Sequence, residues 1–169
     1  MPYSLVFKVL LFTVLVPGSV ILYFPYSFIT KAGAHLQTDY PMLLASATLF
    51  IVIGTATYIR CAWDFAIQGL GTPAPIAPPK NLVVTGLYRR TRNPMYQGVL
   101  MLLFSECALF PEAGLLTYVL SIAAVFHTFV VFREEPELTR RFGASYRDYC
   151  RKVPRWGFAL QPFGGNVNR

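Results

Sequence analysis

Four long stretches of apolar residues alternate with shorter polar and basic segments along this chain. Residues 9–30, 40–59 and 113–132 carry no charged side chain, and residues 93–110 carry one, Glu106. An α-helix needs about 20 apolar residues to cross the hydrocarbon core of a bilayer. The pattern therefore predicts an all-α protein with four membrane-spanning helices. They are placed at residues 5–29, 41–62, 94–110 and 113–132.

Proline and glycine residues modify this picture at two places. Pro17, Gly18 and Pro25 lie inside the first predicted helix, where they predict a kink or an early end. Only Pro111 and Glu112 separate the third predicted helix from the fourth. The last two spans are therefore expected to form a tight antiparallel hairpin.

The composition agrees with an integral membrane protein rather than an ordinary soluble enzyme. Hydrophobic residues make up 54% of the chain and charged residues 14%, whereas a soluble domain carries about 25% charged residues. Small residues at positions 32–34 resemble a signal-peptide cleavage site. The apolar run before them is too long for a signal peptide and follows no basic segment of the usual kind, so we expect no cleavage.

The basic residues are distributed asymmetrically and predict an orientation. The formal net charge is +7, and 13 of the 15 Lys and Arg residues lie at Arg60, in the connector at residues 64–92, or after the fourth helix. Basic loops favour the cytoplasmic side, so we expect the connector and both termini in the cytoplasm of a prokaryotic inner membrane. Because topology explains the basic excess, we expect no nucleic-acid binding. The three cysteines suggest neither a disulfide framework nor a metal site.

Residues 133–152 predict a C-terminal helix outside the membrane. Its less basic side carries residues spaced three or four apart, which therefore share one face. These residues are Glu135, Leu138, Phe142, Tyr146 and Tyr149, and the opposite side carries Arg140, Arg141, Arg147 and Arg151. A basic amphipathic helix of this kind can lie on anionic lipid and can also cover a binding site.

The segment at residues 85–98 leads from a basic loop into the third predicted span. Asn93 can cap that helix with its side chain, and Pro94 suits the first helical position. The free N–H groups of a helix start attract anions, while the aromatic faces of Tyr88 and Tyr96 attract cations. A ligand with a carboxylate and a positive centre would suit this place, although an ordinary helix start at a membrane interface uses the same residues.

Acidic residues follow directly on the fourth span, where basic residues are expected. Glu134, Glu135 and Glu137 surround Pro136, and this arrangement is also typical of a first helical turn. Within the spans, Glu106 and His127 are functional candidates because burying an ionisable group in a membrane is costly. Their positions along the hairpin differ in depth by about 15 Å, so we expect no direct pair.

Two motifs follow one another around the predicted hairpin. The first reads Gly86-x-Tyr88-x-x-x-Arg92-Asn93-Pro94-x-Tyr96-x-Gly98, and the second reads Glu134-Glu135-x-x-Leu138-x-x-x-Phe142-Gly143-x-x-Tyr146-x-x-Tyr149-x-x-x-Val153-Pro154-Arg155. Together they resemble the isoprenylcysteine carboxyl methyltransferase family and the related phospholipid methyltransferases, over about residues 40–158. The resemblance implies an integral membrane enzyme that uses S-adenosylmethionine, with a lipophilic acceptor entering from the bilayer. It divides the chain into an N-terminal pair of spans, residues 1–62, and a catalytic region, residues 63–169.

The resemblance also implies roles for individual residues. The cofactor-binding candidates are Lys80, Asn81, Leu82, Val83, Tyr88, Asn93, Pro94, Met95, Tyr96, Glu134 and Glu135. The catalytic candidates are Arg92, Arg133, Glu134 and Glu135, and the alignment leaves open which glutamate matches the family residue. Arg133 is the candidate for the family's substrate-side arginine. His127 is a second candidate for contact with the methyl acceptor because of its place in the fourth span near the cytoplasmic face, and no metal is expected.

One departure from the family pattern concerns proton transfer. The eukaryotic enzymes have His-Pro where this chain has Asn93-Pro94. Asparagine can form hydrogen bonds but cannot take up a proton near neutral pH, so an acid–base role is excluded at this position. The chain also lacks the additional N-terminal helices of the eukaryotic enzymes, in agreement with the prokaryotic origin expected from its size.

Methyl transfer from a sulfonium mainly requires positioning and desolvation. A carboxylate acceptor needs an arginine to hold it, whereas a protonated amine needs a general base. The sequence offers Arg92 or Arg133 for the first task and Glu134 or Glu135 for the second. We expect carboxyl O-methylation of a lipid-like or prenylcysteine-like acceptor, because the motif resembles that branch. Phospholipid N-methylation and a non-catalytic lipid- or partner-binding membrane protein are the alternatives.

Overall fold

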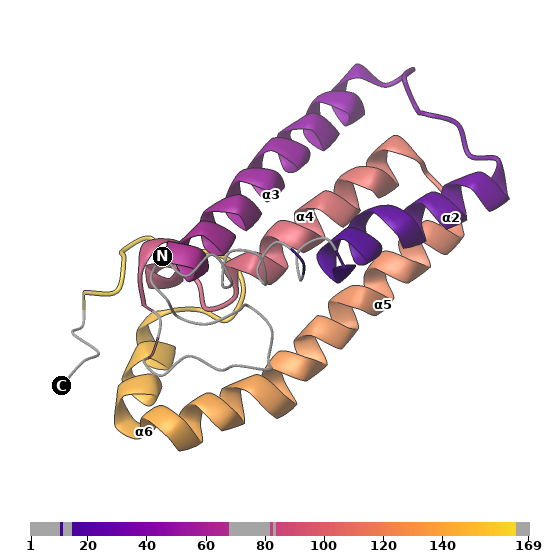
Figure 1. The fold of residues 1–169 in the computed structure, drawn as a ribbon. Helices are drawn as coiled ribbons and strands as arrows, with labels where there is room; N and C mark the ends of the chain where they lie inside the picture. Colours follow the sequence, from indigo (N-terminus) through magenta and orange to yellow (C-terminus); the bar gives the residue numbers. More distant parts are fainter. Residues whose placement is uncertain (1–10, 12–14, 68–81, 83, 165–169) are drawn as a thin grey trace.

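The computed structural model describes residue 11, residues 15–67, residue 82 and residues 84–164 (Figure 1). All regular elements in these residues are helical, which confirms the predicted all-α fold. In chain order they are η1 (Ser19–Tyr23), α2 (Phe24–Ala32), α3 (Pro41–Ile67), η2 (Gly86–Arg89), α4 (Pro94–Leu109), α5 (Ala113–Phe129), η3 (Val130–Glu134) and α6 (Glu135–Lys152).

Two helical runs are long and apolar enough to cross a membrane. They are Pro41–Asp64 and Ala113–Lys152, while the apolar helix Pro94–Leu109 is shorter. The second run contains α5, η3 and α6, with a kink at Gly143 inside α6, so the predicted C-terminal helix begins as a continuation of the fourth predicted span. The structure thus supports a membrane protein, and the number of four spans stays a prediction.

The first predicted helix ends later than expected. Pro25 lacks a backbone N–H, and a wide π-turn at Ser19–Tyr23 accommodates it instead of a helix end. The helix continues to Ala32, where Gly33 adopts φ 62° and closes the C-terminus through hydrogen bonds to carbonyls in the last turn. The start of this helix lies outside the described residues.

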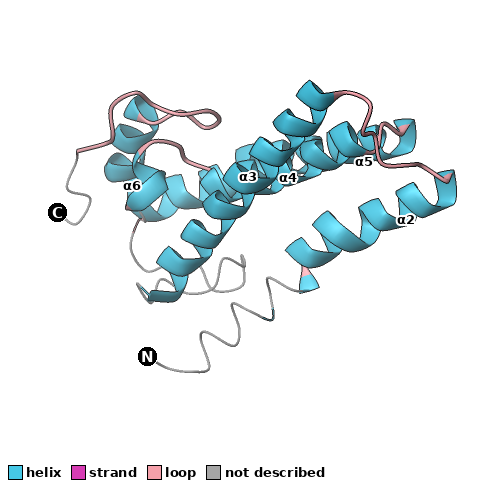
Figure 2. Ribbon diagram, turned by 90° about the horizontal axis from the view of Figure 1, so that it is seen from above, coloured by secondary structure: helices cyan, strands magenta, loops and turns pink. Residues whose placement is uncertain are grey.

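Helices α3 and α4 lie side by side along much of their length (Figure 2). Their backbones meet at Gly54 and Gly98, both of which are buried. A Cβ atom on Gly54 would lie 2.9 Å from the carbonyl oxygen of Gly98, and one on Gly98 would lie 3.0 Å from that of Gly54. Glycine at both positions therefore permits the close helix crossing.

Replacing Gly98 by Ala should lower the stability of the protein, because the new methyl group forces the two backbones apart. We expect a loss of about 1–3 kcal/mol, typical of overpacking, measured as a lower thermal unfolding midpoint in detergent. Ala56→Val is the control, because Ala56 also lies near the crossing in sequence, on helix α3, but its side chain is exposed. An unchanged midpoint for Gly98→Ala would contradict the close crossing.

The predicted hairpin between α4 and α5 is confirmed. Glu112 begins α5, and its carboxylate accepts a hydrogen bond from the backbone N–H of Leu115 at 2.6 Å. The buried side chains of the hairpin join Tyr58 of α3 in one apolar core. This core consists of Tyr58, Val99, Leu103, Leu115 and Val119.

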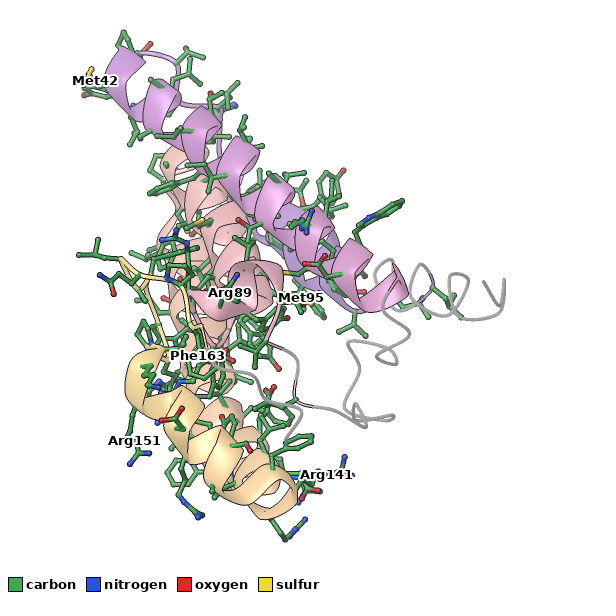
Figure 3. All side chains as sticks on the ribbon, turned by 90° about the vertical axis from the view of Figure 1, so that its left-hand side faces the viewer. Met42, Arg89, Met95, Arg141, Arg151 and Phe163 are labelled. Carbon is green, nitrogen blue, oxygen red and sulfur yellow. The ribbon has the colours of Figure 1, made fainter. Side chains whose placement is uncertain are left out.

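Helix α6 is amphipathic as predicted. Tyr146 and Tyr149 are buried against Val153 and Phe163 of the C-terminal segment, which comprises residues 153–164. The arginines of the opposite side are exposed, and Figure 3 shows Arg141 and Arg151 pointing away from the protein. Within α6, Gly143 adopts φ 53° and ψ −119°, a non-helical conformation that bends the helix. The C-terminal segment then returns to the loop that precedes α4 (Figure 1).

Candidate functional site

The two sequence motifs meet in space at one end of the bundle. The backbone N–H of Arg92 donates to the carbonyl oxygen of Pro154 at 3.0 Å, and the side-chain amide of Asn93 donates to that of Arg155 at 3.1 Å. Further along, Ala159 and Phe163 donate to the carbonyls of Arg90 and Arg89 at 2.7 and 2.8 Å. The C-terminal segment thus fixes the loop before α4.

Asn93 does not use its side chain as predicted. It occupies the N-cap position of α4, but its side chain makes no capping hydrogen bond. The amide group instead donates to the C-terminal segment at Arg155, and this competing long-range contact replaces the local cap. Pro94 does occupy the start of α4, as the sequence predicts.

Glu135 is held by two arginines, one from each motif. Arg155 contacts it with both ends of its guanidinium group, at 2.7 Å to Oε1 and 2.8 Å to Oε2. Arg92 contacts Oε1 at 2.9 Å. The Glu135 side chain is only 16% exposed, and its hydrogen bond raises the pKa of Arg155. This Arg92–Glu135–Arg155 cluster joins α6 to both the α4 loop and the C-terminal segment.

Arg92 has one further contact and one unused donor. Its terminal nitrogen lies 2.9 Å from the sulfur of Cys150. Its Nε atom is buried and has no hydrogen-bond acceptor within the described part of the chain. An unpaired buried donor is costly, so this atom marks a place where an anionic group of a ligand would be favourable.

Glu134 has a different environment from its neighbour. The Tyr96 hydroxyl donates to Glu134 Oε2 at 3.3 Å, and the described residues provide no ion pair to this carboxylate. The Tyr96 ring packs on Phe126 of α5, with ring centroids 4.8 Å apart. A half-buried carboxylate beside aromatic faces can attract a cation.

Tyr88 lies in η2, between α3 and α6. Its backbone carbonyl accepts a hydrogen bond from the Tyr149 hydroxyl at 2.6 Å, and burial raises the pKa of its phenol. Two residues earlier, Gly86 adopts φ 55°, and a Cβ atom there would lie 2.6 Å from Oδ2 of the buried Asp64. Asp64 is itself paired with Arg60 at 3.2 Å, so the end of α3 supports the loop that carries Tyr88.

The remaining residues that the sequence predicted for the site lie in different environments. Lys80, Asn81 and Val83 lie outside the described residues, while Leu82 packs against the apolar cluster that α6 forms with Val153 and Phe163. Arg133 is exposed and forms no ion pair in the part of the chain that is described. His127 is exposed at the end of α5. Among described residues, no group of His, Cys, Asp or Glu side chains could hold a metal ion.

Three residues of this region were missed by the sequence analysis. Arg155 was recognised only as part of a motif, and its role depends on a contact with Glu135 that no local pattern reveals. Asp64 could have been noticed as an acidic residue at the end of an apolar run. Trp156, which contacts His127, follows the second motif directly and carries no signal of its own.

The sequence of the chain is similar to a known protein family. The model of the phospholipid methyltransferase family matches residues 42–145, which is more than half of the chain and includes the first motif and the start of the second. No curated protein and no solved structure shows significant similarity to the chain.

Proposed function

Because the chain belongs to the phospholipid methyltransferase family, whose members are membrane methyltransferases, we propose that it transfers a methyl group from S-adenosylmethionine to the amine of a phospholipid headgroup. The observation that supports this proposal most strongly is that two adjacent carboxylates have different partners. Glu135 is occupied by Arg92 and Arg155, whereas Glu134 accepts a hydrogen bond from the Tyr96 hydroxyl and forms no ion pair within the described part of the chain.

The residues at the site fit S-adenosylmethionine. When bound, this cofactor supplies a methyl group activated by a positively charged sulfonium. The Glu134 carboxylate and the Tyr96–Phe126 aromatic pair suit a positive centre, and the unpaired Nε of Arg92 suits a carboxylate. Met95 packs against the apolar core and the Asn93 side chain donates to Arg155. Further contacts from Tyr88, Asn93, Pro94 and Met95 would therefore come mainly from their backbones. This assignment places the cofactor among α4, α6 and the loop before α4.

An amine fits the acceptor position better than a carboxylate does. A carboxylate acceptor would need a guanidinium group to hold it, but Arg155 is committed to Glu135. Arg92 also binds Glu135, and the proposal assigns its remaining donor, Nε, to the carboxylate of the cofactor. An amine reaches the site as an ammonium ion and must lose a proton before it can act as a nucleophile. Glu134 can first attract the ammonium ion and then accept that proton. Carboxyl O-methylation is the second candidate, and exposed Arg133 would then hold the acceptor.

The other residues of the site act by positioning. The Arg92–Glu135–Arg155 cluster fixes the start of α6, which places Glu134 against Tyr96. The apolar faces of α4 and α5 exclude water from the reacting groups, and this exclusion strengthens electrostatic contacts. The chain itself thus supplies orientation, desolvation and one proton acceptor.

The topology that we propose has four spans, with both termini and this site on the cytoplasmic side of a prokaryotic inner membrane. The positive residues at the site end of the bundle support this orientation. In this arrangement residues 1–62 provide a supporting pair of spans, and residues 63–169 form the catalytic region.

Product analysis separates the candidate functions. The purified protein would be placed in nanodiscs with S-adenosylmethionine labelled in its methyl group, together with phosphatidylethanolamine or a prenylcysteine compound. We expect label in mono-, di- or trimethylated ethanolamine lipid. Label in a base-labile methyl ester of the prenylcysteine would instead support O-methylation, and no label in either acceptor would contradict a methyltransferase with lipid substrates.

A further inference from the structure

His127 of α5 is bound to a tryptophan of the C-terminal segment. The indole Nε1–H of Trp156 donates a hydrogen bond to Nδ1 of His127 at 3.0 Å. The two rings are stacked, with centroids 6.1 Å apart and planes inclined by 29°. This contact joins two segments that also carry residues of the proposed active site.

The direction of this hydrogen bond fixes the tautomer of His127. An indole nitrogen can only donate, so Nδ1 of His127 must be the unprotonated, accepting nitrogen. The proton of the neutral imidazole therefore lies on Nε2. Trp156 thus leaves His127 with one N–H donor, at Nε2, and that side chain is exposed.

The sequence neighbours of His127 and Trp156 both contact residues of the proposed site. Phe126, the neighbour of His127 on α5, packs on the Tyr96 ring that contacts Glu134. Arg155, the neighbour of Trp156, holds Glu135. His127 and Trp156 are thus joined, in sequence, to residues on both sides of the proposed site, and neither is part of the cluster that positions α6.

We infer that the Nε2–H group of His127 donates a hydrogen bond to an anionic oxygen of the phosphodiester in the acceptor lipid, and that Trp156 is the positioning residue that fixes this donor. The inference rests on the proposed function, since a phospholipid acceptor carries a phosphodiester next to its amine. Glu134 would attract the ammonium end of the headgroup, and His127 would contact its phosphate end. A lipophilic amine without phosphate would lack the second contact.

Acceptor kinetics test this role. His127→Leu should raise the KM for phosphatidylethanolamine about tenfold, as expected for one lost hydrogen bond to a charged group, while kcat changes little. The KM for a long-chain primary amine without phosphate should stay unchanged. His127→Gln, which keeps a donor and an acceptor, should restore part of the affinity, and Trp156→Phe should have an intermediate effect.

His35→Leu is the matched control, because His35 is an exposed histidine in the segment between α2 and α3. It should leave the KM of both acceptors unchanged. An equal rise in KM for both acceptors in His127→Leu, or no rise in either, would overturn the inference.

A second measurement does not depend on catalysis. In ¹⁵N NMR spectra of imidazole-labelled protein, wild-type His127 should be protonated at Nε2, and Trp156→Phe should show a mixture of tautomers. Addition of phosphatidylethanolamine should shift the His127 Nε2 signal, whereas the long-chain amine should not. A shift without any methyl transfer would support the phosphate contact and reject the proposed function. No shift in an active enzyme would reject the contact alone.

Discussion

Replacing Glu134 by Gln should reduce methyl transfer by roughly 100-fold or more, which is the usual contribution of a general base. The amide cannot take a proton from the acceptor, and it lacks the negative charge that attracts an ammonium ion. Its carbonyl oxygen can still accept the hydrogen bond from Tyr96, so the fold should be preserved. The measurement is the rate of label transfer to phosphatidylethanolamine, with the thermal unfolding midpoint recorded in parallel.

Glu137→Gln is the control for this variant. Glu137 lies one turn further along α6 and pairs with Arg140 and Arg141 on the outer side of the helix. Its loss should leave the rate near that of the wild type. A Glu134→Gln protein that retains its full rate would remove Glu134 from the mechanism.

Replacing Glu135 by Ala should mainly affect stability. The substitution leaves Arg92 and Arg155 without their shared carboxylate in a largely buried position. Removing one partner of such a cluster costs about 3–5 kcal/mol, so we expect a marked fall in the unfolding midpoint. Backbone amides of the C-terminal segment, such as those of Ala159 and Phe163, should exchange faster with deuterium, because the segment loses its main attachment to α6.

The ion pairs of Glu137 with Arg140 and Arg141 on the protein surface provide the comparison for this variant as well. Glu137→Ala should change stability by no more than about 0.5 kcal/mol, because exposed ion pairs contribute little. Equal midpoints for Glu135→Ala and wild type would show that the Arg92–Glu135–Arg155 cluster does not hold the C-terminal segment. Together, the variants at positions 134 and 135 separate a reactive carboxylate from a structural one.

The regular spacing of apolar and basic residues made helix α6 predictable. Tyr146 and Tyr149 are buried while Arg141 and Arg151 are exposed, because the spacing of apolar residues directly determines which face of a helix can be buried. The C-terminal end of α3 was predicted too early, at residue 62 instead of Ile67. The prediction followed the charge-free run, which stops at Arg60, but a charged residue ends a span without ending the helix.

The different environments of Glu134 and Glu135 were not predictable from the sequence. A one-residue shift in the alignment exchanges them, yet consecutive helical residues point about 100° apart. One carboxylate therefore faces Tyr96 and the other faces the arginines. The contacts of Asn93 and Trp156 were equally inaccessible, since each depends on the return of the C-terminal segment to a distant part of the chain.

Calorimetric titration of the purified protein with S-adenosylmethionine, which carries the positive sulfonium, tests most directly whether the loop before α4 and the start of α6 form a cofactor site. We expect saturable binding at one site per chain. We also expect affinity at least about tenfold weaker, or about 1.4 kcal/mol, in Tyr96→Leu, which removes the aromatic face and hydroxyl but keeps an apolar side chain. Absence of binding to the folded wild-type protein, or equal affinity in the variant, would contradict this assignment.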